Sequence, residues 1–187
     1  MTKIPLLRGE RVTLRGWEPR DAVPFSELNA DPVAMEHFPS TLTRAESDAL
    51  IARAQAALES RGWGWWCLDI DGGCAGFVGL SVPGFEAHFT PCVEIGWRMS
   101  RKHWGRGYAT EAARLAVRYG FDVLELAELV SFTAAGNRRS RAVMERLGMT
   151  HRRIDDFDHP RLEAGHPLRP HVLYRLANPR PSAPNLP

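Results

Sequence analysis

Cysteine and long apolar segments are scarce in this sequence of 187 residues. Its three cysteines, Cys67, Cys74 and Cys92, lack the Cys-x-x-Cys spacing of zinc and redox sites. Two of them fall within apolar strand patterns, where a free thiol packs as a small hydrophobic group. No apolar run reaches the roughly 18 residues of a membrane-spanning helix, and no signal-peptide pattern begins the chain. These absences predict a cytoplasmic protein that does not act at a membrane.

Metal and nucleotide motifs are also missing. The seven histidines are scattered without a His-x-x-x-His pair, so we expect no metal site. A P-loop needs Gly-Lys-Ser/Thr, which does not occur, and the dinucleotide fingerprint needs a small residue where Thr110 stands. The net charge of +2 is too balanced for a nucleic-acid binder. One arginine cluster is either a solvated helix face or a local anion site: Arg138, Arg139, Arg141, Arg146, Arg152 and Arg153.

The composition fits one globular domain with a substantial core, because 44% of the residues are hydrophobic and 25% are charged. We expect this domain to span residues 1–178 and the proline-rich tail, 179–187, to be disordered. Apolar periodicity predicts strands over 11–17, 63–70, 74–82, 92–99, 127–133 and 171–176, with a further strand from 149. Helices are predicted over 21–30, 43–60, 109–121 and 137–147.

The turn between the strand over 92–99 and the helix from 109 is the most informative segment. We call residues 104–110 the glycine turn, because they include Gly105 and Gly107. Glycines let a ligand approach the backbone, and a helix N-terminus offers free N–H groups and the positive end of the helix dipole. The segment therefore predicts an anion site made largely of main chain, with a plain tight turn as the alternative.

Three motifs in succession resemble the GCN5-related N-acetyltransferase (GNAT) superfamily, and in particular its RimJ/RimL-type branch, which acetylates ribosomal-protein N-termini. They are Glu94-Ile95-Gly96-Trp97, residues 104–112, and residues 137–149 with Leu147-Gly148-Met149. The family pattern Gln/Arg-x-x-Gly-x-Gly/Ala is met except at its first position, where Trp104 replaces the polar residue. The resemblance implies an α+β, three-layer α/β/α domain. Its mixed, mostly antiparallel sheet would have about seven strands, flanked by about four helices, and would splay between strands 4 and 5 at a β-bulge.

The resemblance also implies acetyl-CoA as the donor and a primary amine as the acceptor, which attacks directly in a ternary complex. The acceptor would be a protein N-terminal α-amine or a small-molecule amine, held by the first two helices and the loops near Phe38, 83–91 and 155–170. A homodimer through the last strands is open as well. The residues implied to contact CoA are Trp97, Arg98, Met99, Trp104, Gly105, Arg106, Gly107, Tyr108, Ala109, Thr110, Asn137 and Ser140.

Two residues are candidates for proton transfer. Glu94 is a carboxylate in an otherwise apolar strand, so it faces solvent or a cleft, and partial burial would raise its pKa toward that of a base acting through a water. The tyrosine that many superfamily members carry early in the last motif helix is replaced by Met144. Ser140 is the nearest hydroxyl and is the candidate acid, with helix capping as its alternative; Asn137 has the same alternative.

Four questions stay open at this point. The tryptophans at 63, 65 and 66 either pack in the core or line a pocket, and the loop over 83–91 either covers that pocket or only connects two strands. A non-catalytic acyl-CoA-binding module would keep the glycine turn but would need neither Glu94 nor an open acceptor cleft. A protein-interaction module would instead use the arginine cluster on acidic or ribosomal partners.

Overall fold

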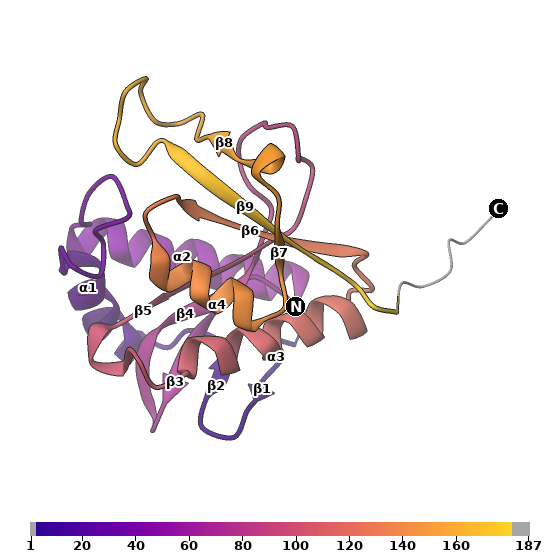
Figure 1. Ribbon diagram of the computed structural model, residues 1–187. Coiled ribbons are helices and arrows are strands. Elements are labelled where there is room, and N and C mark those ends of the chain that lie inside the picture. Colours follow the sequence, from indigo (N-terminus) through magenta and orange to yellow (C-terminus); the bar gives the residue numbers. More distant parts are fainter. Residues whose placement is uncertain (1–2, 181–187) are drawn as a thin grey trace.

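The computed structural model describes residues 3–180, so most of the predicted tail over 179–187 lies outside the described residues (Figure 1). The strands are β1 (Leu7–Arg8), β2 (Thr13–Arg15), β3 (Trp65–Ile70), β4 (Gly73–Ser81), β5 (Glu94–Met99), β6 (Glu128–Ala134), β7 (Thr150–His151), β8 (Phe157–Asp158) and β9 (Pro170–Ala177). The helices are α1 (Ala22–Ala30), α2 (Arg44–Arg61), α3 (Tyr108–Asp122) and α4 (Arg138–Arg146).

The strands form one sheet in the order β1-β2-β3-β4-β5-β6-β9-β7, with β8 also paired to β9. Every pairing among the described strands is antiparallel except that of β5 with β6. The predicted fold class is confirmed, and the sheet has nine strands where about seven were expected. The additional strands include β1 and β8, which are two residues long and too short to show an alternating pattern.

The helices follow their sequence signals closely. At the start of α2, the Thr43 hydroxyl accepts a hydrogen bond from the Glu46 N–H, and the Glu46 carboxylate accepts one from the Thr43 N–H, and together these bonds form a capping box. The helix ends at Gly62, whose φ of 78° is in the left-handed region. α3 and α4 begin and end within two residues of their predicted bounds.

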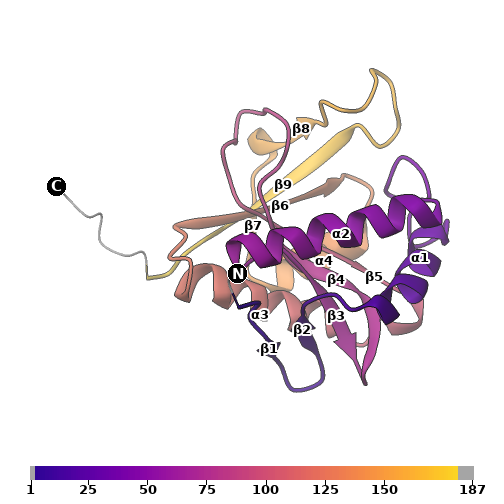
Figure 2. The same ribbon diagram turned by 180° about the vertical axis from the view of Figure 1, so that it is seen from behind.

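Helices cover both faces of the sheet, so the domain has three layers. α1 and α2 lie on one face, against β4 and β3, while α3 lies on the other, against β4 and β5 (Figures 1 and 2). The tryptophans of β3 point to opposite faces: the fully buried Trp66 packs edge-on against Tyr119 of α3, and Trp65 stacks on Phe77. Trp66 is thus a core residue, and Trp65 remains free to line a site on the α1/α2 face.

β5 and β6 separate almost as soon as they meet, because Glu94 and Val130 are their one recorded pair. The predicted splay between these two strands is therefore present. The predicted bulge is wrong, since the β4–β5 ladder keeps a single register from Ser81–Glu94 to Gly76–Met99. An irregularity is instead found in the β3–β4 ladder, where Leu68 pairs with Gly76 and Asp69 pairs with Cys74, so that one residue of β4 is skipped. The gap arises because β6 diverges to pair along its whole length with β9.

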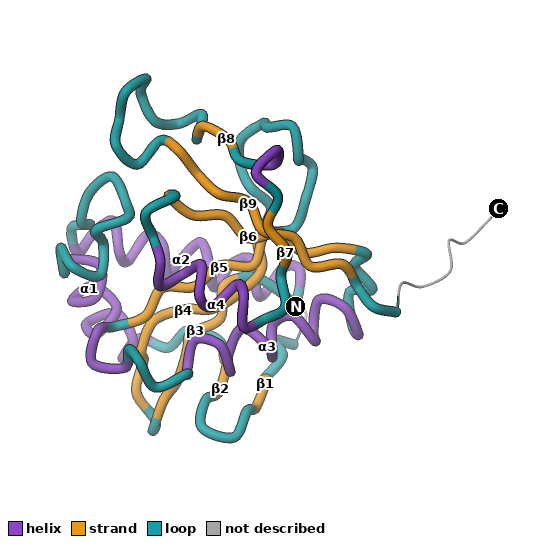
Figure 3. The backbone as a smooth tube through the Cα atoms, viewed as in Figure 1, coloured by secondary structure: helices purple, strands orange, loops and turns teal. Residues whose placement is uncertain are grey.

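The loop between β4 and β5 packs on the part of the sheet that β6, β8 and β9 form. Figure 3 shows it next to β8 and near the loop that leads to β9. Phe85 and Phe89 join a separate apolar cluster that includes Phe132 and Phe157, and the Arg161 guanidinium donates to the Gly84 carbonyl. The loop is thus more than a connection: it supports the wall of the sheet beside the gap.

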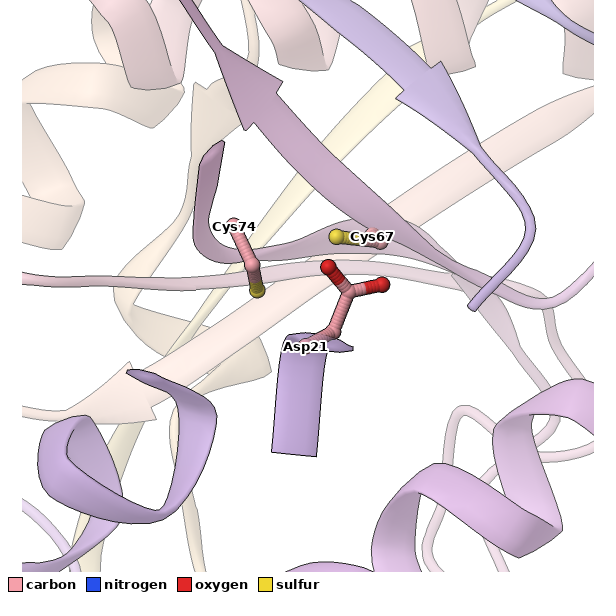
Figure 4. A group of neighbouring side chains, drawn as sticks. All are labelled: Asp21, Cys67 and Cys74. Atoms are coloured by element: carbon pink, nitrogen blue, oxygen red, sulfur yellow. The ribbon is translucent and has the colours of Figure 1, made fainter. Parts of the chain in front are cut away.

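A buried ion pair joins β2 to the start of α1. The Arg15 guanidinium donates to both Asp21 oxygens at 2.7 and 2.8 Å. Asp21 also lies beside the buried thiols of Cys67 and Cys74 (Figure 4). A carboxylate oxygen of Asp21 and the two Sγ atoms lie within 4.8 Å of one another. The Cys74 thiol and burial raise the pKa of Cys67. Because Arg15 already supplies the positive charge, we assign this group to the core.

Within residues 3–180, no helix combines the length and the apolar character that crossing a membrane requires.

Candidate active site

A cavity of about 900 Å³ lies at the gap between β5 and β6. Its walls come from β5, β6, the glycine turn, α4, the segment between α1 and α2, and the segment before β9. The structure brings to it nearly all of the predicted site residues: Glu94, Trp97, Arg98, Met99, Trp104, Gly105, Gly107, Ala109, Thr110, Asn137 and Ser140. Arg106 and Tyr108 do not line it.

The glycine turn has the geometry of an anion site. Gly105 and Gly107 have φ values of 75° and 81°, which are strained for any residue with a Cβ. A Cβ built on Gly105 would meet no atom within 4 Å, so the space above the backbone is open. Gly107 is the N-cap of α3, and no side chain caps this helix. The first-turn N–H groups of a fifteen-residue helix therefore keep no side-chain partner beside the cavity.

Arg11 holds the outer side of the glycine turn, which explains where Arg106 and Tyr108 lie. Its guanidinium donates to the Arg106 carbonyl at 3.0 Å, lies 4.9 Å from the centre of the Tyr108 ring, and forms an ion pair with Glu111 at 2.8 Å. No site role was predicted for Arg11. No pattern could have indicated one, because the contacts join positions about 100 residues apart.

Trp104, the departure from the family pattern, ties the turn to β5. Its indole Nε1–H donates to the Met99 carbonyl at 2.8 Å. The Arg139 guanidinium lies 4.2 Å from the centre of the indole ring and forms an ion pair with Glu36. Arg138 and Arg139 line the cavity near the turn. Two members of the arginine cluster thus lie beside the glycine turn, and a local anion site, the second interpretation of the cluster, stays a prediction.

Glu94 lies at the point where β5 leaves β6, and it lines the cavity. Its carboxylate accepts a hydrogen bond of 3.4 Å from the Ser81 hydroxyl. A Cβ at Gly96 would come within 3.6 Å of the Glu94 Oε1, so the missing side chain leaves space above the strand next to the carboxylate. Burial raises the pKa of Glu94 from its usual value near 4.5 to about 8.

Asn137 and Ser140 form a small hydrogen-bonded unit at the start of α4. The Asn137 Oδ1 accepts from the Ser140 N–H, and its Nδ2 donates to the Ser140 and Thr133 hydroxyls at 3.1 and 2.9 Å. Asn137 is therefore the helix N-cap, as its structural alternative predicted, and it lines the cavity at the same time. Met144 is buried in the cavity wall, so the family's tyrosine hydroxyl has no counterpart at this position.

The α1/α2 face of the cavity is largely aromatic. Trp65 and Phe77 form its floor on β3 and β4, and Phe38 reaches it from the segment between α1 and α2. Arg98 of β5 lies between the rings, 4.1 Å from the centre of Phe38 and 5.6 Å from that of Phe77. Its Nη1 donates to the Asn29 Oδ1 at 2.6 Å. Arg98 was predicted to contact CoA, and no role was predicted for Asn29.

Another part of the cavity rim contains two histidines, His159 in the segment before β9 and His171 in β9 itself. The rings of His159 and His171 are 4.9 Å apart, and both residues line the cavity. Burial, together with the positive potential of His171 and Arg161, lowers the pKa of His159 to about 4. Burial also lowers the pKa of His171 below its usual value near 6.5. These contacts fit the prediction that the segment over 155–170 contributes to the acceptor side.

A family model described as an acetyltransferase (GNAT) domain matches residues 11–150. The chain therefore belongs to the GNAT family of acetyltransferases, which use acetyl-CoA, and it is an acyltransferase.

Named relatives and solved structures agree with this assignment. The chain is 36% identical over 132 residues to FsC-acetyl coenzyme A-N(2)-transacetylase of Aspergillus fumigatus, a match that covers 67% of this chain and 56% of that protein. An acetyltransferase structure from Agrobacterium tumefaciens is 29% identical, with a TM-score of 0.73 over 94% of this chain and 96% of that one. RimL, a ribosomal L7/L12 α-N-protein acetyltransferase solved with coenzyme A, shares the fold at 13% identity, with a TM-score of 0.74 over 92% and 98% of the two chains.

Proposed function

We propose that this protein transfers the acetyl group of acetyl-CoA to a primary amine by direct attack within one ternary complex, as a RimJ/RimL-like member of its family. The observation that carries the proposal is the continuity of the cavity. The glycine turn, the exposed side of β5, Glu94 and Ser140 all line the same space. Donor and acceptor can therefore meet without a covalent enzyme intermediate.

The donor would occupy the gap between β5 and β6. The uncapped N-terminus of α3 suits its diphosphate, because the first-turn N–H groups have no side-chain partner. Arg138 and Arg139 add positive charge beside it, with Arg139 also paired to Glu36. β5 leaves β6 after Glu94, so the backbone from Trp97 to Met99 has β4 on one side only. Amide groups of an extended ligand can pair with the free side.

The chemistry follows from the groups around the gap. The amine nitrogen forms a bond to the acetyl carbon, the carbon–sulfur bond breaks, and the amine loses a proton while the thiolate gains one. Glu94, acting through a water, accepts the proton of the amine, since its raised pKa of about 8 suits a base near neutral pH. Ser140 is the hydroxyl placed to position or protonate the thiolate, because Asn137 fixes its orientation.

The acceptor amine is either a protein N-terminal α-amine or the amine of a small molecule. The names of the Aspergillus protein and of RimL refer to an N2 amine and to a protein α-amine respectively. We propose that the acceptor enters between Phe38 and His159, on the face away from the glycine turn, because both residues line the cavity there.

A screen of acetyl-CoA consumption tests the proposal. Purified protein is mixed with acetyl-CoA and with N-terminal peptides, amino acids, aminoglycosides or polyamines, and release of the CoA thiol is measured. Turnover on at least one amine is expected, together with a reduction of 100-fold or more in kcat/KM for Glu94→Gln. Binding of acetyl-CoA without turnover on any amine would instead support a non-catalytic acyl-CoA-binding module.

A further inference from the structure

Arg98 is a cation without a carboxylate partner. Its Nε is buried and has no hydrogen-bond acceptor among the described residues. Its one recorded hydrogen bond is to the neutral amide of Asn29, and its other close neighbours are the Phe38 and Phe77 rings. Within residues 3–180, no carboxylate lies within ion-pair distance of it.

This lack of a counter-charge distinguishes Arg98 from other arginines near the cavity. Arg139 pairs with Glu36, and Arg101 pairs with Asp31. Burial lowers the pKa of Arg98 only to about 10, so the guanidinium stays charged near pH 7. A half-buried charge costs free energy unless it is paired, and part of this side chain faces the cavity.

A second arginine on the same side also lacks a carboxylate partner. Arg161, which lines the cavity from the segment before β9, donates to the Gly84 carbonyl and forms no ion pair within the described part of the chain. The one carboxylate on the β5 floor is Glu94, four residues before Arg98. A strand rise of about 3.3 Å per residue places their Cα atoms about 13 Å apart. Glu36, the other carboxylate that lines the cavity, is already paired with Arg139, so positive charge prevails on the acceptor side, away from Glu94.

The phosphates of acetyl-CoA do not supply the missing charge under the proposed binding mode. Side chains alternate along a strand, so Arg98 points to the α1/α2 face, as its contacts with Asn29 and Phe38 show. The glycine turn opens α3, which covers the opposite face. The diphosphate and Arg98 therefore belong to different sides of β5.

We propose that Arg98 is a specificity-determining residue that selects acceptor amines bearing an anionic group, a carboxylate or a phosphate, several bonds from the reacting nitrogen. This inference rests on the proposed acetyl transfer. The amine would lie near Glu94 while its anionic group pairs with the Arg98 guanidinium, where a charge-assisted hydrogen bond forms in partly dry surroundings. Polycationic acceptors such as polyamines would be disfavoured by the same charge.

Matched acceptors test this inference. Initial rates are measured for 4-aminobutanoate against its amide, O-phosphoethanolamine against ethanolamine, and peptides with Asp against Asn at the second position. The three pairs distinguish a free carboxylate, a phosphate and an acidic peptide as the source of the charge. We expect at least one anionic member to exceed its neutral counterpart 10- to 100-fold in kcat/KM. Arg98→Met should abolish that preference through the acceptor KM, and Arg98→Lys should keep part of it.

Two controls separate a specific role from loss of structure. Arg44→Gln removes an exposed cation, paired with Asp48 on the surface of α2, and should leave the preference unchanged. The acetyl-CoA Kd of Arg98→Met should stay within about threefold of wild type, whereas a Kd weakened tenfold or more would assign Arg98 to the donor and overturn the inference. The melting temperature identifies variants that do not fold, for which Arg98→Gln is the replacement.

The outcomes also separate this inference from the proposed function. Equal rates within every acceptor pair, with turnover intact, would overturn the role of Arg98 and leave acetyl transfer standing. Turnover on no amine would overturn the proposed function. In that case, calorimetric binding of the acid and amide probes to the protein saturated with CoA still decides the role of Arg98: preference for the acids that Arg98→Met removes supports it, and equal binding refutes it.

Discussion

Replacing Glu94 with Gln should make the protein more stable and less active at the same time. The carboxyl group has a pKa near 4.5 in the unfolded chain and about 8 in the folded protein. Between these two values, the unfolded state releases the proton while the folded state retains it. Stability from this group is therefore fully present below pH 4.5 and is lost as the pH rises toward 8. Glutamine does not ionise, so the variant escapes this loss.

The magnitude follows from the width of that pH interval. At pH 7 the unfolded carboxyl is about 2.5 pH units above its pKa, which corresponds to about 3 kcal/mol at 1.36 kcal/mol per unit. Solvent in the cavity screens part of this penalty, because Glu94 lines an open space. We expect Glu94→Gln to be more stable than wild type by about 1–3 kcal/mol at pH 7, with the difference growing steadily from pH 5 to pH 8.

Urea unfolding of both proteins at pH 5, 6, 7 and 8 measures this difference. The companion assay is the pH dependence of kcat/KM for an acceptor amine whose own pKa is known. Wild-type activity should rise as Glu94 loses its proton near pH 8, and this limb should be missing in the variant. Two stability curves that remain parallel across the pH range would refute the buried, protonated carboxyl on which the proposed base depends.

Three further variants test other parts of the site and the core. Gly105→Ala puts a Cβ on a residue with left-handed backbone angles and fills the space of the proposed anion site. Calorimetry should show about tenfold weaker acetyl-CoA binding, and unfolding should show a loss of stability of about 1–2 kcal/mol. Unchanged affinity would exclude this turn from binding. Asn137→Ala removes the cap that orients Ser140. Chemical unfolding should show a loss of about 1 kcal/mol in stability, and kinetic assays should show a lower kcat. An unchanged kcat would show that the orientation of Ser140 by Asn137 does not contribute to catalysis. Asp21→Leu removes the bidentate partner of Arg15, which keeps its ion pair with Asp69, so urea unfolding should show a loss of about 1–3 kcal/mol, and unchanged stability would contradict the assignment of this ion pair to the core.

Local signals explain which parts of the fold the sequence could predict. Thr43 and Glu46 are three residues apart, and the capping box needs only that spacing. The hairpin at Gly72 and the helix after Gly107 likewise depend on glycines that adopt positive φ within a short segment. The glycine turn could therefore be located from the sequence, without any tertiary contact.

The parts that could not be predicted depend on contacts between distant segments. Arg98 and Asn29 are 69 residues apart, and no periodicity indicates that one side chain will reach the other. Alternation along β5 could have shown that Glu94 and Arg98 share a face, but the identity of that face depends on how α1 packs. The gap beside β5 was predicted with the wrong cause, because the divergence of β6 is set by its pairing with β9 and not by a local bulge.

The most direct test of the central claim is to follow both products of one reaction in the same sample. Release of the CoA thiol is measured by a colorimetric reagent, and acetylation of the acceptor amine is measured by mass spectrometry. The account predicts that the two products appear in equal amounts, that no acetylated enzyme accumulates, and that both rates fall together in Glu94→Gln. Thiol release without an N-acetylated product, or a stable acetyl-enzyme, would contradict direct transfer in this cavity.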